Sequence, residues 1–155
     1  MPMPKDKARE HIDQVLEKCG WKVQNHKSAD LQAERGVALR NFPLSSGHGF
    51  VDYLLYIDGK AAGIIEAKKE GSPLVGVEAQ AAKYGKGLPS VLPAYVRPFP
   101  FLYQSTGVET RFTNRLDPEP RSQQVFSFHR PGTLAEWLEG QASRRMTASA
   151  TMWRL

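Results

Sequence analysis

The sequence predicts an α/β domain built around a mixed β-sheet. Two observations carry this prediction: a helix-length segment with an apolar stripe opens the chain, and a hairpin of two apolar strands is followed by a second helix and further strands. A hairpin makes antiparallel neighbours, whereas a strand–helix–strand connection makes parallel ones, so this order of elements favours strands of both directions.

The first predicted helix covers residues 6–19. Its apolar side chains recur three or four positions apart, and Gly20 ends the pattern. We expect one face of this helix to pack on the sheet through Ala8, Ile12, Val15, Leu16 and Cys19.

The predicted strands are short runs rich in aromatic and β-branched residues. A first strand at residues 37–42 ends at Pro43, and strands at 51–57 and 61–68 are joined by the hairpin signal Asp58-Gly59. A second helix is expected at 75–86. It is followed by strands at 99–103, at 109–113 (as an edge strand) and at 125–128. A capping box that opens at Thr133 predicts a short last helix through Leu138.

Length and composition indicate one domain. The 155 residues are enough for a hydrophobic core, and we expect the domain to cover residues 1–139, with 140–155 as a linker or disordered tail. The single cysteine excludes an internal disulfide and fits a reducing cytoplasm. No membrane segment is expected, because no run of about 18 apolar residues occurs. The net charge of +5 permits a polyanionic partner without identifying one.

The predicted hairpin carries the residues with the clearest chemistry. Asp52 lies on its first strand, and Glu66 and Lys68 end the second, two residues apart and so on one side of a strand. Hydrolysis of a phosphodiester needs an activated water and a positive charge near the phosphorane, and a divalent metal supplies both. Mg²⁺ prefers oxygen ligands. Asp52, Glu66 and the backbone carbonyl of Ala67 are therefore candidate metal ligands, with Lys68 placed to orient the attacking water.

The register of the hairpin tests this hypothesis. A regular two-residue turn at Asp58-Gly59 pairs residues whose numbers sum to 117, which places Asp52 opposite Ile65 and sends Glu66 to the other face. A three-residue loop, or a β-bulge between residues 52 and 66, gives an even sum and brings the two carboxylates to one face. A nuclease site therefore predicts one of these two features.

Two polar residues on the predicted second helix are further candidates. Gln80 and Tyr84 are four positions apart and so share one face of the helix, where an amide and a phenol can hold a phosphate or the lysine. The alternative is that Tyr84 packs in the core and Gln80 faces solvent.

Together these residues resemble the PD-(D/E)xK nuclease core, with the Q-x-x-x-Y motif of RecB-like nucleases. The wider pattern resembles the N-terminal endonuclease domain of the restriction (R) subunit of type I restriction–modification enzymes. The resemblance covers roughly residues 6–138, and short phrases spread along the chain carry it: AREHID at 8–13, GW at 20–21, VDYLL at 51–55, GIIEAK at 63–68, GLP at 87–89 and ETRFTN at 109–114.

The resemblance implies a restriction-endonuclease-like core and a role for each site residue. Asp52 and Glu66 would bind Mg²⁺, for which Mn²⁺ can substitute, and Lys68 would be catalytic. Gln80 and Tyr84 would be an accessory pair, and an acidic residue of the first helix would join them, with Glu10 as the first candidate and Asp13 as the second. Val51 stands where the motif has its nominal proline.

The resemblance also implies partners. The expected activity is Mg²⁺-dependent endonucleolytic cleavage of double-stranded DNA, within a complex that contains modification and specificity subunits. R subunits carry an ATP-driven translocase after the nuclease domain. This chain has no G-x-x-x-x-G-K-[ST] loop, so ATP is expected only for a translocase part that the sequence lacks.

Two other interpretations remain open. The same fold can serve as a catalytically silent module that binds DNA or partner subunits, and carboxylates on opposite sheet faces would favour it. A basic α/β domain with a fortuitous hairpin would instead bury Tyr84 away from Glu66. Several basic residues are candidates for phosphate contacts or for ordinary surface charge: Lys5, Lys7, Arg9, Lys83, Lys86 and Arg144-Arg145.

Overall fold

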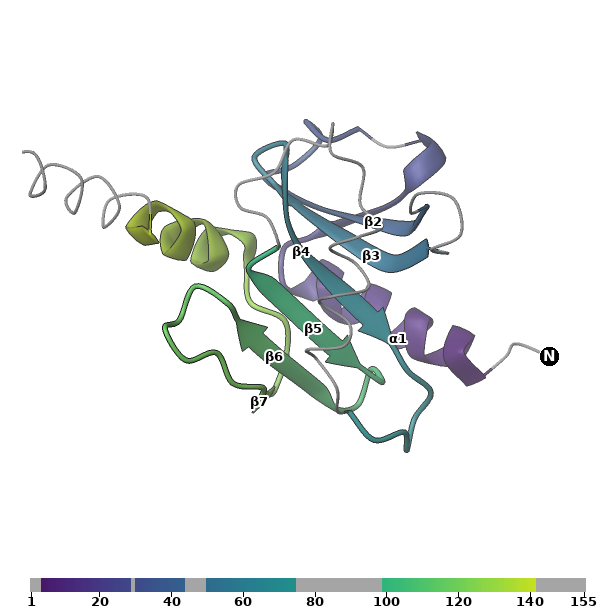
Figure 1. Cartoon of the computed structure of the whole chain (residues 1–155). Helices are drawn as coiled ribbons and strands as arrows, with labels where there is room; N and C mark the ends of the chain where they lie inside the picture. The colour runs from purple at the N-terminus through teal and green to yellow at the C-terminus, as the bar shows by residue number, and fades with distance from the viewer. Residues whose placement is uncertain (1–3, 29, 44–49, 75–98, 142–155) are drawn as a thin grey trace, which may run out of the picture.

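The structure is a computed structural model that describes residues 4–28, 30–43, 50–74 and 99–141. Its described strands form one seven-stranded mixed sheet with helices packed against it, which confirms the predicted α/β class (Figure 1). None of the described helices is long and apolar enough to cross a membrane.

The strands lie in the sheet in the order in which they occur in the chain. The pairs β1–β2 and β4–β5 are parallel, and the other neighbours are antiparallel. The strand bounds are β1 Lys22–Asn25, β2 Gly36–Pro43, β3 Phe50–Ile57, β4 Lys60–Ala67, β5 Phe101–Ser105, β6 Thr110–Asn114 and β7 Gln123–Val125, and a short 3₁₀ helix, η1 (His26–Ser28), follows β1.

Strands β4 and β5 pair in parallel in the middle of the sheet. Parallel neighbours need a long connection, and here it includes the helix predicted at residues 75–86, which lies outside the described residues. That prediction and the loop predicted at 45–49 therefore stay predictions.

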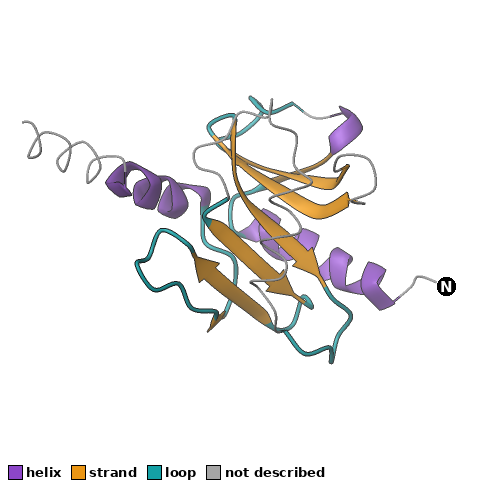
Figure 2. Cartoon of the chain, in the orientation of Figure 1, coloured by secondary structure: helices purple, strands orange, loops and turns teal. Residues whose placement is uncertain are grey.

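Both described α-helices pack against the same face of the sheet (Figure 2). Helix α1 (Pro4–Lys18) contributes Ile12 and Leu16, both fully buried, as its apolar stripe predicts. The helix at residues 131–141 contributes Leu134 and Leu138 to the same core. Between the helices and the sheet lie buried side chains from the central strands, among them Tyr53, Leu55, Ile65, Phe101 and Tyr103.

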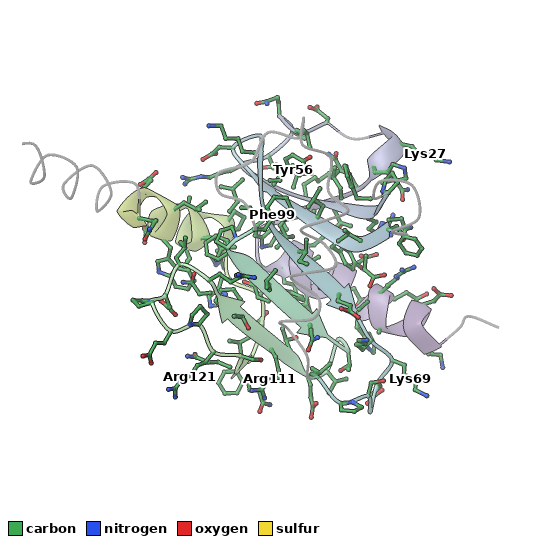
Figure 3. The ribbon with its side chains drawn as sticks, in the orientation of Figure 1. Lys27, Tyr56, Lys69, Phe99, Arg111 and Arg121 are labelled. Atoms are coloured by element: carbon green, nitrogen blue, oxygen red, sulfur yellow. The ribbon has the colours of Figure 1, made fainter. Side chains whose placement is uncertain are left out.

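The opposite face of the sheet has its own apolar cluster. Tyr56 and Phe99, both labelled in Figure 3, belong to it, together with Leu54, Ile64 and Leu102. The central strands β3 and β4 are therefore buried on both faces, which explains why their sequences read as nearly continuous apolar runs.

Three predictions about the later elements need correction. Strand β6 is an interior strand, because β7 pairs with it and forms the edge. Strand β7 ends at Val125, where the prediction had it begin. The last helix starts at residue 131, two residues before the predicted capping box, because the fixed φ of Pro131 suits the first helical position and the backbone amides of Thr133 and Leu134 both donate to the carbonyl of Arg130.

Candidate active site

The β3–β4 hairpin turns through two residues. Asp58 and Gly59 both have positive φ, 51° and 83°, as a type I′ turn requires, and Ile57 pairs directly with Lys60. The three-residue loop that the sequence allowed is therefore wrong, because the turn residues close the hairpin without a third.

A β-bulge shifts the pairing of β3 with β4 by one residue from the register that this turn sets. Tyr56 pairs with Ala61, but the next residue, Leu55, pairs with Gly63, so Ala62 is an extra residue on β4. Beyond the bulge Tyr53 pairs with Ile65, and this even register, continued by one residue, aligns Asp52 with Glu66. The bulge is one of the two features that the nuclease hypothesis predicted, and it is confirmed.

Asp52 lies where β3 and β4 separate, and its side chain is nearly inaccessible, with 4% of its surface exposed. Its Oδ2 accepts a hydrogen bond of 2.9 Å from the backbone amide of Ala67. The carboxylate thus accepts the hydrogen bond that a backbone carbonyl of β3 would otherwise accept at this end of the β3–β4 pair. This bond fixes the Asp52 side chain beside the backbone of residues 66–68.

The other oxygen of Asp52 is held from helix α1. The Nη2 of Arg9 donates to Oδ1 of Asp52 in a charge-assisted hydrogen bond, and the arginine side chain is 22% exposed. Arg9 is therefore not the ordinary surface charge that its sequence context allowed.

Glu66 and Lys68 form a second ion pair at the end of β4. Lys68 Nζ lies 2.7 Å from Oε1 of Glu66, and the side chains are 40% and 16% exposed. The backbone amide of Lys68 donates to the carbonyl of Ser105 on β5, which continues the parallel pairing past the end of β4. Gln104, buried on β5, pairs in register with Glu66.

A polar layer joins α1 to the sheet next to Asp52. The buried hydroxyl of Tyr53 lies 2.5 Å from Oδ1 of Asp13 and 3.0 Å from the carbonyl oxygen of Arg9, and its single proton is shared between these two acceptors. Burial and the bond to Asp13 raise the pKa of Tyr53 far above its usual value, so the hydroxyl keeps the proton that it donates. Arg40 completes the layer through an ion pair of 2.8 Å with Asp13.

The remaining predicted residues divide into two groups. Gln80 and Tyr84 lie outside the described residues. Glu10 is exposed on α1, whereas its neighbour Arg9 and the alternative candidate Asp13 both face the sheet.

Comparisons with known proteins identify the family to which the chain belongs. The model of a protein family described as the second domain of the type I restriction enzyme EcoKI endonuclease subunit matches residues 19–97, slightly more than half of the chain. The chain belongs to this family. The match with this endonuclease-subunit domain includes Asp52, Glu66 and Lys68, but not the part of α1 that carries Arg9.

A solved structure supports the fold of this type I restriction-enzyme domain. It is a fragment described as the HsdR subunit of a type I restriction enzyme from Vibrio vulnificus YJ016, with a TM-score of 0.65 and 21% sequence identity. The alignment covers 90% of this chain and 26% of that chain, so the present sequence spans about a quarter of the Vibrio fragment. The search of curated proteins found no match.

The donor set at the end of the hairpin suits a hard cation. Asp52 and Glu66 would supply carboxylate oxygens and Ala67 a carbonyl oxygen, a set without sulfur or imidazole. Within the described ranges, no group of three or more His, Cys, Asp or Glu side chains is placed to hold a metal. A metal at this site would therefore rest on two carboxylates, one backbone carbonyl and water.

A cavity of about 470 Å³ lies elsewhere on this restriction-enzyme domain. It opens between β6, β7 and the helix at residues 131–141, and its lining includes Phe112, Asn114, His129 and Trp137. Asn114 pairs with Phe101, at the opposite end of β5 from Ser105, so the cavity is at the far end of the sheet from Lys68.

Proposed function

We propose that this chain is the nuclease domain of a type I restriction R subunit and that it hydrolyses phosphodiester bonds of double-stranded DNA with Mg²⁺. The observation that carries the proposal is the Ala62 bulge, because it gives the hairpin the even register that the nuclease hypothesis requires, which the two-residue turn alone would not give. Family membership supports the same function.

Each residue of the site has a proposed role. Asp52, Glu66 and the carbonyl of Ala67 would hold Mg²⁺, which when bound supplies an activated water and offsets negative charge on the phosphate. Lys68, already 2.7 Å from Glu66, would orient the attacking water or stabilise the developing charge. Gln80, Tyr84 and the exposed Glu10 are proposed as accessory residues that contact the substrate or the lysine.

The proposed partners follow from the family. Double-stranded DNA is the substrate, and modification and specificity subunits complete the complex. ATP is needed only for a translocase part outside this sequence.

Cleavage of supercoiled plasmid in Mg²⁺ or Mn²⁺ tests this function. We expect nicking that stops in EDTA and falls by about a hundredfold or more in Asp52→Asn and in Lys68→Ala. Lys69→Ala is the matched control, because Lys69 is exposed immediately beyond Lys68 and should be dispensable (Figure 3). Equal nicking by all four proteins would trace the activity to another site or to a contaminant.

One observation favours a second candidate function, the silent module that binds DNA or partner subunits. Arg9 already neutralises Asp52 within the protein, as expected if the carboxylate had become structural. Calorimetric titration with Mg²⁺ separates the two functions. Binding that Asp52→Asn abolishes supports the nuclease, and the absence of both binding and cleavage supports the silent module.

A further inference from the structure

Arg9 contacts the candidate site, but none of the catalytic or metal-binding roles proposed above includes it. Its guanidinium pairs with Asp52, its Nη1 lies 3.8 Å from Asp6, and its Cζ lies 5.7 Å from the centre of the Phe50 ring. Its backbone carbonyl accepts the Tyr53 hydroxyl bond, so the sheet holds α1 at this residue.

The ion pair meets an electrostatic requirement of the metal-free protein. A carboxylate as buried as that of Asp52 is strongly unfavourable unless a positive charge or several donors compensate it. Arg9 supplies that charge to Asp52, and Lys68 supplies it to Glu66. Each carboxylate of the site therefore has a cation from the chain itself.

A divalent ion bound to Asp52 changes this balance. The ion and the guanidinium would share one carboxylate, a few Å apart in a site with little water, where like charges repel strongly. Arg9 is also incompletely satisfied, because within the described part of the chain its Nε is buried without a hydrogen-bond partner. The guanidinium is thus the group that can leave when the ion enters.

We propose that Arg9 is a displaceable counter-ion, which neutralises Asp52 in the metal-free protein and is released from it when a divalent cation binds. This inference rests on the proposed metal site. It adds that metal binding breaks a contact between the sheet and α1. Two half-exposed groups already lie near the Arg9 guanidinium: the carboxylate of Asp6 and the ring of Phe50. Both can bind the guanidinium at the surface once it leaves Asp52.

Metal affinity in the absence of DNA is the direct test. We expect Arg9→Gln to bind Mg²⁺ at least about tenfold more tightly than the unmodified chain in calorimetry, because the competing charge is gone. Arg40→Gln is the matched control. Arg40 also bridges the sheet to α1, but its ion pair is with Asp13, and within the described residues its Nε is likewise buried without a hydrogen-bond partner. Its loss should leave the Mg²⁺ affinity unchanged.

Thermal unfolding gives a second readout. In EDTA, Arg9→Gln should unfold at a lower temperature than the unmodified chain, since Asp52 is left without its counter-ion. Saturating Mg²⁺ should then raise the unfolding temperature more in Arg9→Gln than in the unmodified chain. If Arg9 had only a packing role, Arg9→Gln would lower the unfolding temperature by the same amount with and without the ion.

The outcomes separate this inference from the function on which it rests. If the unmodified chain binds Mg²⁺ and Arg9→Gln binds it equally or more weakly, the counter-ion inference is wrong and the nuclease proposal stands. If neither protein binds Mg²⁺, both are wrong. Should Arg9→Gln fail to fold, Arg9→Met also removes the charge and keeps a long side chain that can pack against the sheet. It should also bind Mg²⁺ at least about tenfold more tightly than the unmodified chain, and unchanged affinity would overturn the inference.

Discussion

Asp52 shows how one side chain joins the fold to the proposed chemistry. It is a buried carboxylate whose two oxygens are held from different elements, by the amide of Ala67 on β4 and by Arg9 on α1. Such a group is expensive to bury and is retained only where its surroundings compensate it.

A histidine at the other end of the sheet provides a pH-dependent prediction. The Nδ1 of His129 lies 2.6 Å from the hydroxyl of Tyr103, and burial lowers the pKa of His129. Burial also raises the pKa of Tyr103, so the tyrosine donates and the neutral imidazole accepts.

The sign of the pH effect follows from this lowered pKa. The unfolded chain takes up a proton near the ordinary histidine pKa of about 6.5, before the folded chain does. The contribution of His129 to stability is therefore complete above that pH and is lost as the pH falls below it. Urea unfolding from pH 7 to pH 5 should show a smaller loss of unfolding free energy in His129→Gln than in the unmodified chain. Parallel losses in the two proteins would show that His129 does not carry this effect.

At this scale the sequence predicted the candidate residues but not their partners. Asp52, Glu66 and Lys68 are recognisable because a D…E-x-K set ends an apolar strand. Arg9 looked like one of several cations on the first helix, because its contact with Asp52 spans 43 positions and depends on how α1 crosses the sheet. One signal was available in the sequence. Arg9 follows Ala8 and lies one turn before Ile12, and both of these apolar residues are buried.

At the scale of elements, the hairpin determines the geometry of the site. The type I′ turn was predictable from Asp58-Gly59, and it alone sets an odd register. The bulge restores the even register, and the sequence marked it only through the small residues Ala62 and Gly63. The sequence thus left an odd and an even register open, and the structure has the even one beyond the bulge.

Gly63 gives the prediction for this element. A Cβ at this position would lie 2.6 Å from the carbonyl oxygen of Phe101 on β5, and a backbone atom cannot easily move away. We expect Gly63→Ala to lower the unfolding free energy by about 1–3 kcal/mol, the usual cost of overpacking, as measured by denaturant titration.

The same substitution elsewhere is the control. Gly132 lies near the start of the helix at residues 131–141, and a Cβ there would come no closer than 3.8 Å to a neighbouring atom, the Nη1 of Arg35. Gly132→Ala should raise the unfolding free energy by about 0.5–1 kcal/mol, because alanine loses less backbone entropy in a helix. Destabilisation of similar size at both positions would mean that close approach to β5 is not what requires Gly63.

At the scale of the whole molecule, the sheet order and the family agree. The seven strands lie in sequential order, and β4 pairs in parallel with β5 beside the hairpin. The start of β3 and the end of β4 lie next to α1, where Arg9 and Asp13 reach the sheet (Figure 1). The class of fold was predictable from element order, because hairpin and crossover signals are local in sequence. The edge position of β7 was not, because a three-residue strand with two exposed glutamines carries almost no pattern.

The proposed metal site consists of Asp52, Glu66 and the carbonyl of Ala67, where β3 and β4 separate. Crystals of this chain grown with Mn²⁺ would locate the ion through its anomalous signal. We expect one strong peak in coordination contact with both carboxylates and the Ala67 carbonyl, and an Arg9 guanidinium no longer paired with Asp52. A structure with no ion at these residues, and with the Arg9–Asp52 pair intact at saturating Mn²⁺, would rule out this site.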